Sequence, residues 1–343
     1  MIISSLLVLA LTGGSAVSAA ETKVIKFATL APEGTTAMKV MTQLSDELAD
    51  KTHGALKFKF YAGGVQGDEQ DVVKKIRIGQ LQAGGFTGVG IGEIAPEARI
   101  LDAPWLFRNE KEVDYVYKAF DKPLSASIER GGYVLLGWTE LGWVYVFSKN
   151  PINSPEDLPA QKMWVWEGDP IAHAAYDALG VTPISLPVID VMSSLQTGLI
   201  DGVYGPPTYV NALQWSTRAK YIYSMPMAYS SGAVLISKKF FDSLEPELQK
   251  TLKEVSARHL HELNDLSRKE NLEALATMQS QGLVMSAKPS AAQVARYEEL
   301  GIKARRELAG KLYSAELLGK IEKALDDKRG GGGAHPSGKA KKS

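Results

Sequence analysis

The sequence predicts an α/β protein built from two halves, with one long helix running across both. Segments typical of strands alternate with segments of helical spacing in two separate series, the pattern of sheets covered by helices. A later stretch, Glu245–Gln281, has Pro246 at its start and then neither Pro nor Gly until Gly282. The chain has 343 residues, 45% of them apolar, which favours a core divided into two units.

The first series predicts strand, helix, strand, helix and strand, as in a parallel sheet with helices on its faces. Buried strands are read from apolar or alternating runs, and helix ends from the Gly that follows them. In order, the expected elements are a strand at Val24–Leu30, a helix over Ala37–Leu48, a strand at Leu56–Tyr61, a helix from Asp68 to Gly79 and a strand at Gln82–Thr87.

The second series repeats this alternation after Pro151. Its expected elements are a strand at Lys162–Trp166, a helix over Pro170–Leu179, a strand at Ile184–Leu186, a helix over Asp190–Thr197 and a strand at Asp201–Tyr204. The β-rich stretch Tyr133–Ser148 joins the two series, and Ala233–Ser237 adds a further strand.

The helix expected at Glu245–Gln281 would be roughly 55 Å long at about 1.5 Å per residue. One small α/β domain does not cover such a length, so we expect the helix to pack on both halves. A break near Asn264 is the alternative. Two α/β halves with a crevice between them commonly bind a small ligand there.

Composition disfavours several classes of function. With 39 basic and 39 acidic residues the net charge is zero, which disfavours nucleic acid and anionic membranes as partners. The absence of Cys excludes disulfides, thiolate metal sites and a Cys nucleophile. The five His residues are scattered, so we expect no metal site.

The first 20 residues predict a secretory signal. An apolar run too short to span a bilayer precedes small residues and a cleavage site at Val17-Ser18-Ala19. No Lys or Arg precedes the run, and a buried N-terminal helix is the alternative. An exported chain works outside the cytoplasm. Residues 330–343 are Gly-rich and then basic, which predicts a disordered tail.

Catalytic and cofactor motifs are weak. Gly90-Ile91-Gly92-Glu93-Ile94-Ala95 matches the letters of a dinucleotide fingerprint, but Pro96 stops the helix that this motif requires. Glu140, Glu167 and Asp169 are candidate acid–base carboxylates, although Asp169 before Pro170 is also a good helix N-cap. No nucleophile, base and orienting group assemble from the spacing, which favours binding over catalysis. A secreted hydrolase using these three carboxylates is the alternative.

Tryptophan is concentrated near the crossover between the halves. Four of the six Trp residues lie between 138 and 166. Trp164 and Trp166 are two apart on a predicted strand, so their rings share a face. Such a pair can line a ligand cleft, stacking on flat groups or holding a cation, or it can belong to the core.

Taken in order, a set of motifs resembles the periplasmic solute-binding subunit of tripartite ATP-independent periplasmic (TRAP) transporters, of the dicarboxylate-binding-protein type. The resemblance covers residues 24 to about 320. Its motifs are Phe27-Ala28-Thr29-Leu30-Ala31-Pro32-Glu33-Gly34, Gly67-Asp68-Glu69, Ile78-Gly79-Gln80-Leu81, Leu101-Asp102-Ala103-Pro104-Trp105-Leu106-Phe107, Pro151-Ile152 with Glu156-Asp157-Leu158, Ala178-Leu179-Gly180-Val181-Thr182-Pro183 and Leu195-Gln196-Thr197-Gly198-Leu199-Ile200-Asp201-Gly202.

The resemblance implies a periplasmic-binding-protein fold, with two α/β domains that close on a ligand by a hinge and a long helix that braces both. We expect domain I at 21–146 plus about 233–262, and domain II at 147–232 plus about 263–329. It also implies a small organic solute and membrane permease subunits as partners, a periplasmic location, and neither catalysis nor a cofactor.

One departure from the family pattern concerns the ligand. The strand that usually carries a carboxylate-binding Arg, in a K-[IM]-R-[VT] setting, reads Lys162-Met163-Trp164-Val165 here. A guanidinium forks two donors onto a carboxylate, whereas an indole offers one N–H and a π face. We therefore expect an apolar, aromatic or cationic ligand. A carboxylate held by Lys162, Arg218 or backbone N–H groups is the alternative.

Trp164, Trp166 and Tyr204 are expected to form the ligand wall. The further expected contacts are Glu69, Thr87, Trp138, Glu140, Glu167 and Asp169.

Overall fold

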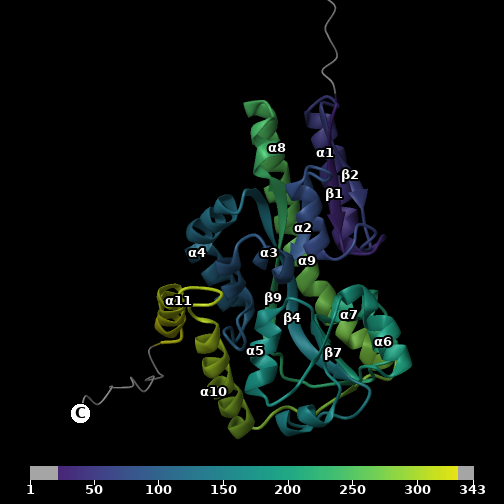
Figure 1. Ribbon diagram of the computed structural model, residues 1–343, viewed down its shortest axis with the longest axis vertical. Coiled ribbons are helices and arrows are strands. Elements are labelled where there is room, and N and C mark those ends of the chain that lie inside the picture. Colours follow the sequence, from purple (N-terminus) through teal and green to yellow (C-terminus); the bar gives the residue numbers. More distant parts are fainter. Residues whose placement is uncertain (1–21, 331–343) are drawn as a thin grey trace, which may run out of the picture.

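The computed structural model describes residues 22–330 and has two lobes joined by long shared elements (Figure 1). The signal predicted for residues 1–20 lies outside the described residues, as does the tail predicted for 330–343 apart from Gly330. Lobe I lies in the upper part of Figure 1 and contains α1 and α2, and lobe II lies below it and contains α5, α6 and α7.

Lobe I contains the predicted parallel strands, in the order β2-β1-β3. Apolar faces drive its assembly: Phe27 of β1 and Leu44 of α1 are both buried, and the Thr35 hydroxyl caps α1 by accepting a hydrogen bond from Met38 N. Its elements are β1 (Lys23–Thr29), α1 (Thr36–Lys51), β2 (Leu56–Tyr61), α2 (Glu69–Arg77), β3 (Ala83–Thr87), α3 (Gly88–Gly92), the 3-10 helix η1 (Pro96–Asp102) and α4 (Glu110–Arg130).

Two long strands, β4 (Tyr133–Ser148) and β9 (Ala228–Ser237), pair antiparallel and pass from one lobe to the other. In lobe I, β9 pairs with β3, while in lobe II β4 pairs with β7 (Gly202–Gly205) and β8 (Tyr221–Ile222). One sheet therefore continues through both lobes, in the order β10-β8-β4-β9-β3-β1-β2 with β7 on β4.

Lobe II differs from the second parallel series that the sequence predicts. Of the strands predicted in that series, β5 (Trp164–Trp166) and β6 (Ile184–Leu186) pair parallel as a separate two-stranded sheet. The last one, β7, instead pairs antiparallel with the end of β4, which also pairs antiparallel with β8. The other elements of lobe II are η2 (Pro155–Ala160), α5 (Pro170–Ala178), η3 (Val188–Asp190), α6 (Val191–Thr197), α7 (Pro207–Ala212), η4 (Trp215–Thr217) and β10 (Val284–Met285).

The predicted long helix is confirmed as α9 (Pro246–Ser280), which has 35 residues and packs on α1 in lobe I, on β4 and on α7 in lobe II. It has no break near Asn264. That side chain instead accepts a hydrogen bond from Glu140 N and donates one to Trp138 O, which fixes α9 on the irregular part of β4.

The remaining helices are α8 (Lys238–Asp242), α10 (Ala291–Leu308) and α11 (Ala315–Lys328). Helix α10 packs on α5 of lobe II, and α11 packs on α4 of lobe I. The sequence-based domain prediction places α11 in the second domain, whereas its buried Ile321 and Leu325 pack in a cluster made mostly of lobe I residues, among them Val113 of α4.

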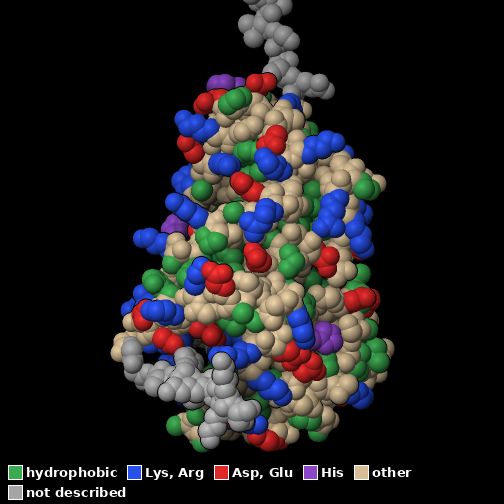
Figure 2. Space-filling view, turned by 60° about the vertical axis from the view of Figure 1, so that its left-hand side comes forward, with side chains coloured by type: hydrophobic (Ala, Val, Ile, Leu, Met, Phe, Trp, Pro, Cys, Tyr) green, Lys and Arg blue, Asp and Glu red, His purple; other side chains and the backbone are tan. Residues whose placement is uncertain are grey.

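Acidic and basic side chains are interspersed on the face shown in Figure 2, in keeping with the balanced composition. Within residues 22–330 no helix has both the length and the apolar character needed to cross a membrane.

Candidate functional site

Two adjoining cavities lie between the lobes. One, here called the aromatic chamber, has a volume of about 320 Å³ and is lined by Trp164, Trp166, Tyr204 and Trp215 among others. The other, here called the hydroxyl chamber, has a volume of about 400 Å³ and is bounded by β1, the start of α1, α7 and α9. Both are lined by Leu30, Thr87, Leu141 and Tyr209, so the chambers meet at these residues.

The wall of the aromatic chamber is a stack of rings. Trp164 stacks on Tyr204 with ring centroids 5.0 Å apart and planes 24° apart, and the Trp166 ring lies 6.2 Å from Trp164. Trp215 meets Trp164 edge to face at 5.3 Å. Trp164 is only 1% exposed, so it is at once a core residue and part of the chamber wall.

The polar atoms of Trp164, Trp166 and Tyr204 are already engaged. Trp164 Nε1 donates to Leu186 O at 3.0 Å, and Trp166 Nε1 donates to Asp68 Oδ2 at 3.1 Å. The Tyr204 hydroxyl donates to Asp169 Oδ2 at 2.8 Å, and burial together with the charge of Asp169 raises the pKa of Tyr204, which keeps this donor protonated. These rings therefore offer a ligand mainly their faces and edges.

A buried ion cluster adjoins the rings and joins the lobes. Arg99 of η1 lies in lobe I; its Nη2 is 2.7 Å from Asp169 Oδ1 of lobe II, and its Nε is 3.1 Å from Asp102 Oδ2. Burial lowers the pKa of Arg99, but the charges of Asp169 and Asp102 outweigh burial and the pKa rises. Ser231 N and Oγ donate to Asp102 Oδ1. Sequence reasoning missed Arg99, although a charged residue between Ala98 and Ile100 in an apolar run was a usable signal.

Gly88 is needed for this cluster. A Cβ atom at Gly88 would lie 1.8 Å from Asp102 Oδ2 and 3.1 Å from Arg99 Nε. No side chain fits there unless the Asp102 carboxylate moves away from the guanidinium.

Asp169 caps a helix, which was one of the two roles considered from the sequence, and it also forms an ion pair. Its Oδ1 accepts hydrogen bonds from Ile171 N and Ala172 N at the start of α5. The same side chain thus fixes a helix of lobe II and binds Arg99 of lobe I.

Glu69 and Thr87 lie where the two chambers meet lobe I. The Glu69 carboxylate accepts hydrogen bonds from Thr87 N, Thr87 Oγ1 and Gly90 N at 2.7, 2.9 and 2.6 Å. Burial raises the pKa of Glu69 to about 7 despite these donors. Glu69 lines the hydroxyl chamber, and Thr87 lines both chambers.

The other predicted site residues are dispersed. Glu140 lines the hydroxyl chamber but is bound by Arg268 through two bonds of 2.7 and 2.8 Å. Glu167 is exposed and lines neither chamber. The Trp138 indole donates to Asp121 and also lies outside both chambers.

Neither basic side chain that the sequence offered for a carboxylate lines a chamber. Lys162 is exposed and donates to Gly198 O, and Arg218 is exposed directly after η4. Among the described residues, Arg99 is the only Lys, Arg or His that lines the aromatic chamber.

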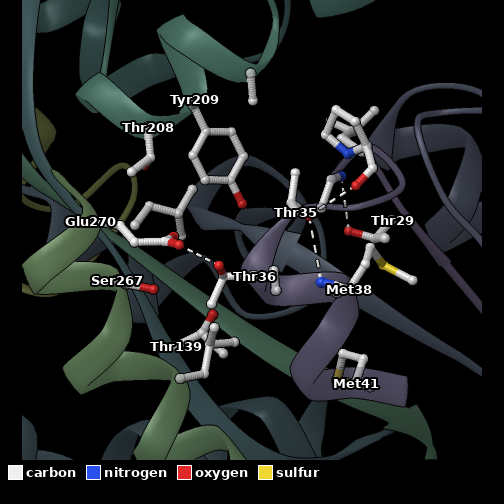
Figure 3. Close-up of a pocket in the computed structure, with 18 of the residues that line it drawn as sticks. Thr29, Thr35, Thr36, Met38, Met41, Thr139, Thr208, Tyr209, Ser267 and Glu270 are labelled. Carbon is white, nitrogen blue, oxygen red and sulfur yellow. Dashed lines mark hydrogen bonds between the residues drawn. The ribbon is translucent and has the colours of Figure 1, made fainter. Parts of the chain in front are cut away.

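The hydroxyl chamber has several hydroxyl and carboxylate groups among its apolar lining, and neither Glu69 nor Glu270 in it is paired with a cation of the described chain. Figure 3 shows Glu270 of α9 facing Thr36, whose hydroxyl donates to it, with the Tyr209 ring directed into the same space from α7. Sequence reasoning missed Tyr209 and Glu270, since only the packing of α9 between the lobes brings them together.

Known proteins similar to this chain are solute receptors. Residues 27–311 match the family described as bacterial extracellular solute-binding protein, family 7 (DctP). The 2,3-diketo-L-gulonate-binding periplasmic protein YiaO of Escherichia coli is 30% identical over 61% of this chain and 64% of its own length, just under two thirds of that relative. The C4-dicarboxylate-binding periplasmic protein DctP of Rhodobacter capsulatus is 24% identical over 92% of this chain and 97% of its own.

A solved structure agrees. The TRAP periplasmic solute-binding protein from Citrobacter koseri with bound D-glucuronate superposes with a TM-score of 0.81 at 25% identity, covering 89% of this chain and 99% of its own. The three relatives are named as periplasmic binding proteins, and the family is described as extracellular solute-binding proteins. The chain therefore belongs to the DctP family of TRAP periplasmic solute-binding proteins.

Proposed function

We propose that this TRAP solute receptor binds a small organic solute whose flat, apolar or aromatic group occupies the aromatic chamber without a carboxylate there, and that it delivers the solute to TRAP permease subunits. The observation that carries the proposal is the pairing of Arg99. Within residues 22–330 it is the one cation lining the aromatic chamber, and Asp169 and Asp102 already bind it.

Charge at the chamber wall disfavours an organic acid. The cluster sets two carboxylates against one guanidinium. A carboxylate ligand would have to displace Asp169 from Arg99, which costs the energy of a buried pair, or bind beside two acidic groups. The named ligands of relatives are acids, such as D-glucuronate and C4-dicarboxylates, and the resemblance found in the sequence implies an Arg where this chain has Trp164.

The ring wall supplies an attraction suited to a flat group. Offset or tilted rings contribute about 0.5–1.5 kcal/mol for each pair beyond the area that they bury. With their N–H and O–H groups engaged, Trp164, Trp166 and Tyr204 select for shape and polarizability rather than for hydrogen bonding.

Lobe closure would follow from contacts on both sides of the cleft. Trp166 of lobe II donates to Asp68 of lobe I, so one residue of the ring wall itself joins the lobes. A solute that touches both lobes binds the closed state better than the open one, and this difference in affinity shifts the population toward closure.

The ligands of relatives favour a second candidate, a carboxylate receptor. It requires Arg99 to exchange Asp169 for the ligand or a carboxylate to bind backbone N–H groups. It predicts that D-glucuronate or succinate binds with micromolar affinity.

Isothermal titration calorimetry separates the two candidates. Indole and 2-naphthol, which are neutral, and the acids D-glucuronate and succinate are each titrated into the protein. We expect the aromatic compounds to bind and the acids to fail, and we expect Trp164→Phe to weaken aromatic binding while Trp138→Phe, outside both chambers, leaves it unchanged. Micromolar binding of either acid would overturn the proposal.

A further inference from the structure

The hydroxyl chamber adjoins the aromatic chamber and differs from it in chemistry. Leu30, Thr87, Leu141 and Tyr209 line both, so a solute with its ring against Trp164 can extend a tail past them. Each chamber alone has the volume of a small ligand site. From the chemistry of the second chamber we infer that it binds a primary ammonium group on the same solute, with Glu270 as its counter-ion. The inference rests on the proposed function.

Two carboxylates of this chamber, Glu69 and Glu270, have no cation among the described residues, and only Glu270 lacks a set of backbone and side-chain donors that engages both of its oxygens. Glu69 is saturated by three donors, and Glu140 is bound by Arg268. Glu273 is exposed and lies 3.7 Å from Lys269. Glu270 accepts a hydrogen bond from the Thr36 hydroxyl, and in the described part of the chain no Lys, Arg or His lies within ion-pair distance of it.

Among the described residues, Lys39 is the one basic side chain that could neutralise Glu270 from within the chamber lining. It lines the hydroxyl chamber but is exposed, and no ion pair joins it to any described acidic group. The partly buried Glu270 carboxylate therefore favours a cation brought by the ligand, since a charge inside a cleft is screened less than one on the open surface.

Hydroxyl groups complete the site for an ammonium ion. Thr139, Tyr209 and Ser267 line the chamber, and no hydrogen bond joins their hydroxyls to the residues drawn around them (Figure 3). An ammonium group has three donors and no acceptor, so it is matched by one carboxylate and neighbouring hydroxyl oxygens. A carboxylate tail would instead meet Glu270 with like charge.

Three probes that share one ring and one linker test the inference by calorimetry: tryptamine, tryptophol and indole-3-propionate, each extended by homologues with longer methylene linkers. We expect the best amine to bind at least about ten-fold more tightly than the matched alcohol, and the acid to bind most weakly. Glu270→Gln keeps an acceptor for Thr36 and should abolish the advantage of the amine while leaving the alcohol within about two-fold. Glu262→Gln, on the same helix but exposed and outside both chambers, is the matched control and should change neither.

The outcomes separate this inference from the proposed function. An alcohol that binds through Trp164 as tightly as the amine, or an amine unaffected by Glu270→Gln, overturns the ammonium site and leaves the aromatic receptor standing. Failure of all three probe series at every linker length overturns both. Tighter binding of the acid than of the amine and the alcohol also overturns both the ammonium site and the proposed function. It would show that the cleft accepts an anion.

Discussion

Replacing Asp169 by Asn removes one charge from the ion cluster that joins the lobes. Asn caps helices as well as Asp does, but its single oxygen can replace only Oδ1, which caps α5 and faces Arg99. Its amide NH2 then lies where Oδ2 accepts from the Tyr204 hydroxyl, so the change removes the charge together with that hydrogen bond, and Tyr204→Phe measures the part due to the hydrogen bond. The Asp169 and Arg99 side chains are 6% and 3% exposed, which makes this a buried pair. Removing one partner of such a pair costs about 3–5 kcal/mol, and we expect the lower end, about 3 kcal/mol, because Asp102 still faces Arg99.

That cost falls on the closed state, since the Asp169 contact spans the two lobes. A loss of about 3 kcal/mol from the closed state weakens any ligand that requires closure by about two orders of magnitude. Calorimetry measures the affinity, and small-angle X-ray scattering measures the radius of gyration, which should increase in Asp169→Asn. Asp177→Asn, an exposed change on the same helix, is the control. An unchanged radius together with less than about a three-fold change in affinity would refute the interlobe role.

Two further predictions concern Glu69 and Gly88. Burial raises the pKa of Glu69 from 4.5 to about 7, so the folded protein binds this proton more tightly than the unfolded chain does. The stabilisation is therefore full below pH about 4.5 and is lost as the pH rises to about 7. Urea unfolding should show that the free energy of unfolding of the wild type falls by about 3 kcal/mol across this window relative to that of Glu69→Gln. Unfolding free energies that change with pH in parallel for the two proteins would contradict the assignment. Gly88→Ala places a methyl group against Asp102 and should lower the melting temperature by several degrees, a loss of about 2 kcal/mol or more. The control Gly319→Ala, on open helix surface, should be neutral or slightly stabilising, and equal melting temperatures for the two variants would exclude the clash.

The elements of lobe I and the long helix are predictable from the sequence because their signals are local. Asp68 before α2, Asp169 before α5 and Pro246 at the start of α9 mark helix ends through capping chemistry that acts over a few residues. Alternation along β5 likewise places Trp164 and Trp166 on one face, and both line the aromatic chamber.

The parts that sequence reasoning missed depend on contacts between distant segments. Arg99 and Asp169 are 70 residues apart, and Thr36 and Glu270 are 234 apart. These residues meet because the two lobes pack on the same helix, α9. A local sequence pattern does not encode that packing. For the same reason the antiparallel sheet of lobe II was not predicted, because it depends on β4 continuing from lobe I.

Native mass spectrometry of the protein purified from periplasm, without exchange of its ligand, tests the central claim most directly. We expect an aromatic or apolar solute, neutral or carrying an amine, to co-purify with the wild-type protein. The Trp164→Phe variant should retain less of this solute than the Trp138→Phe variant. A sugar acid or dicarboxylate retained by the wild-type receptor would contradict it.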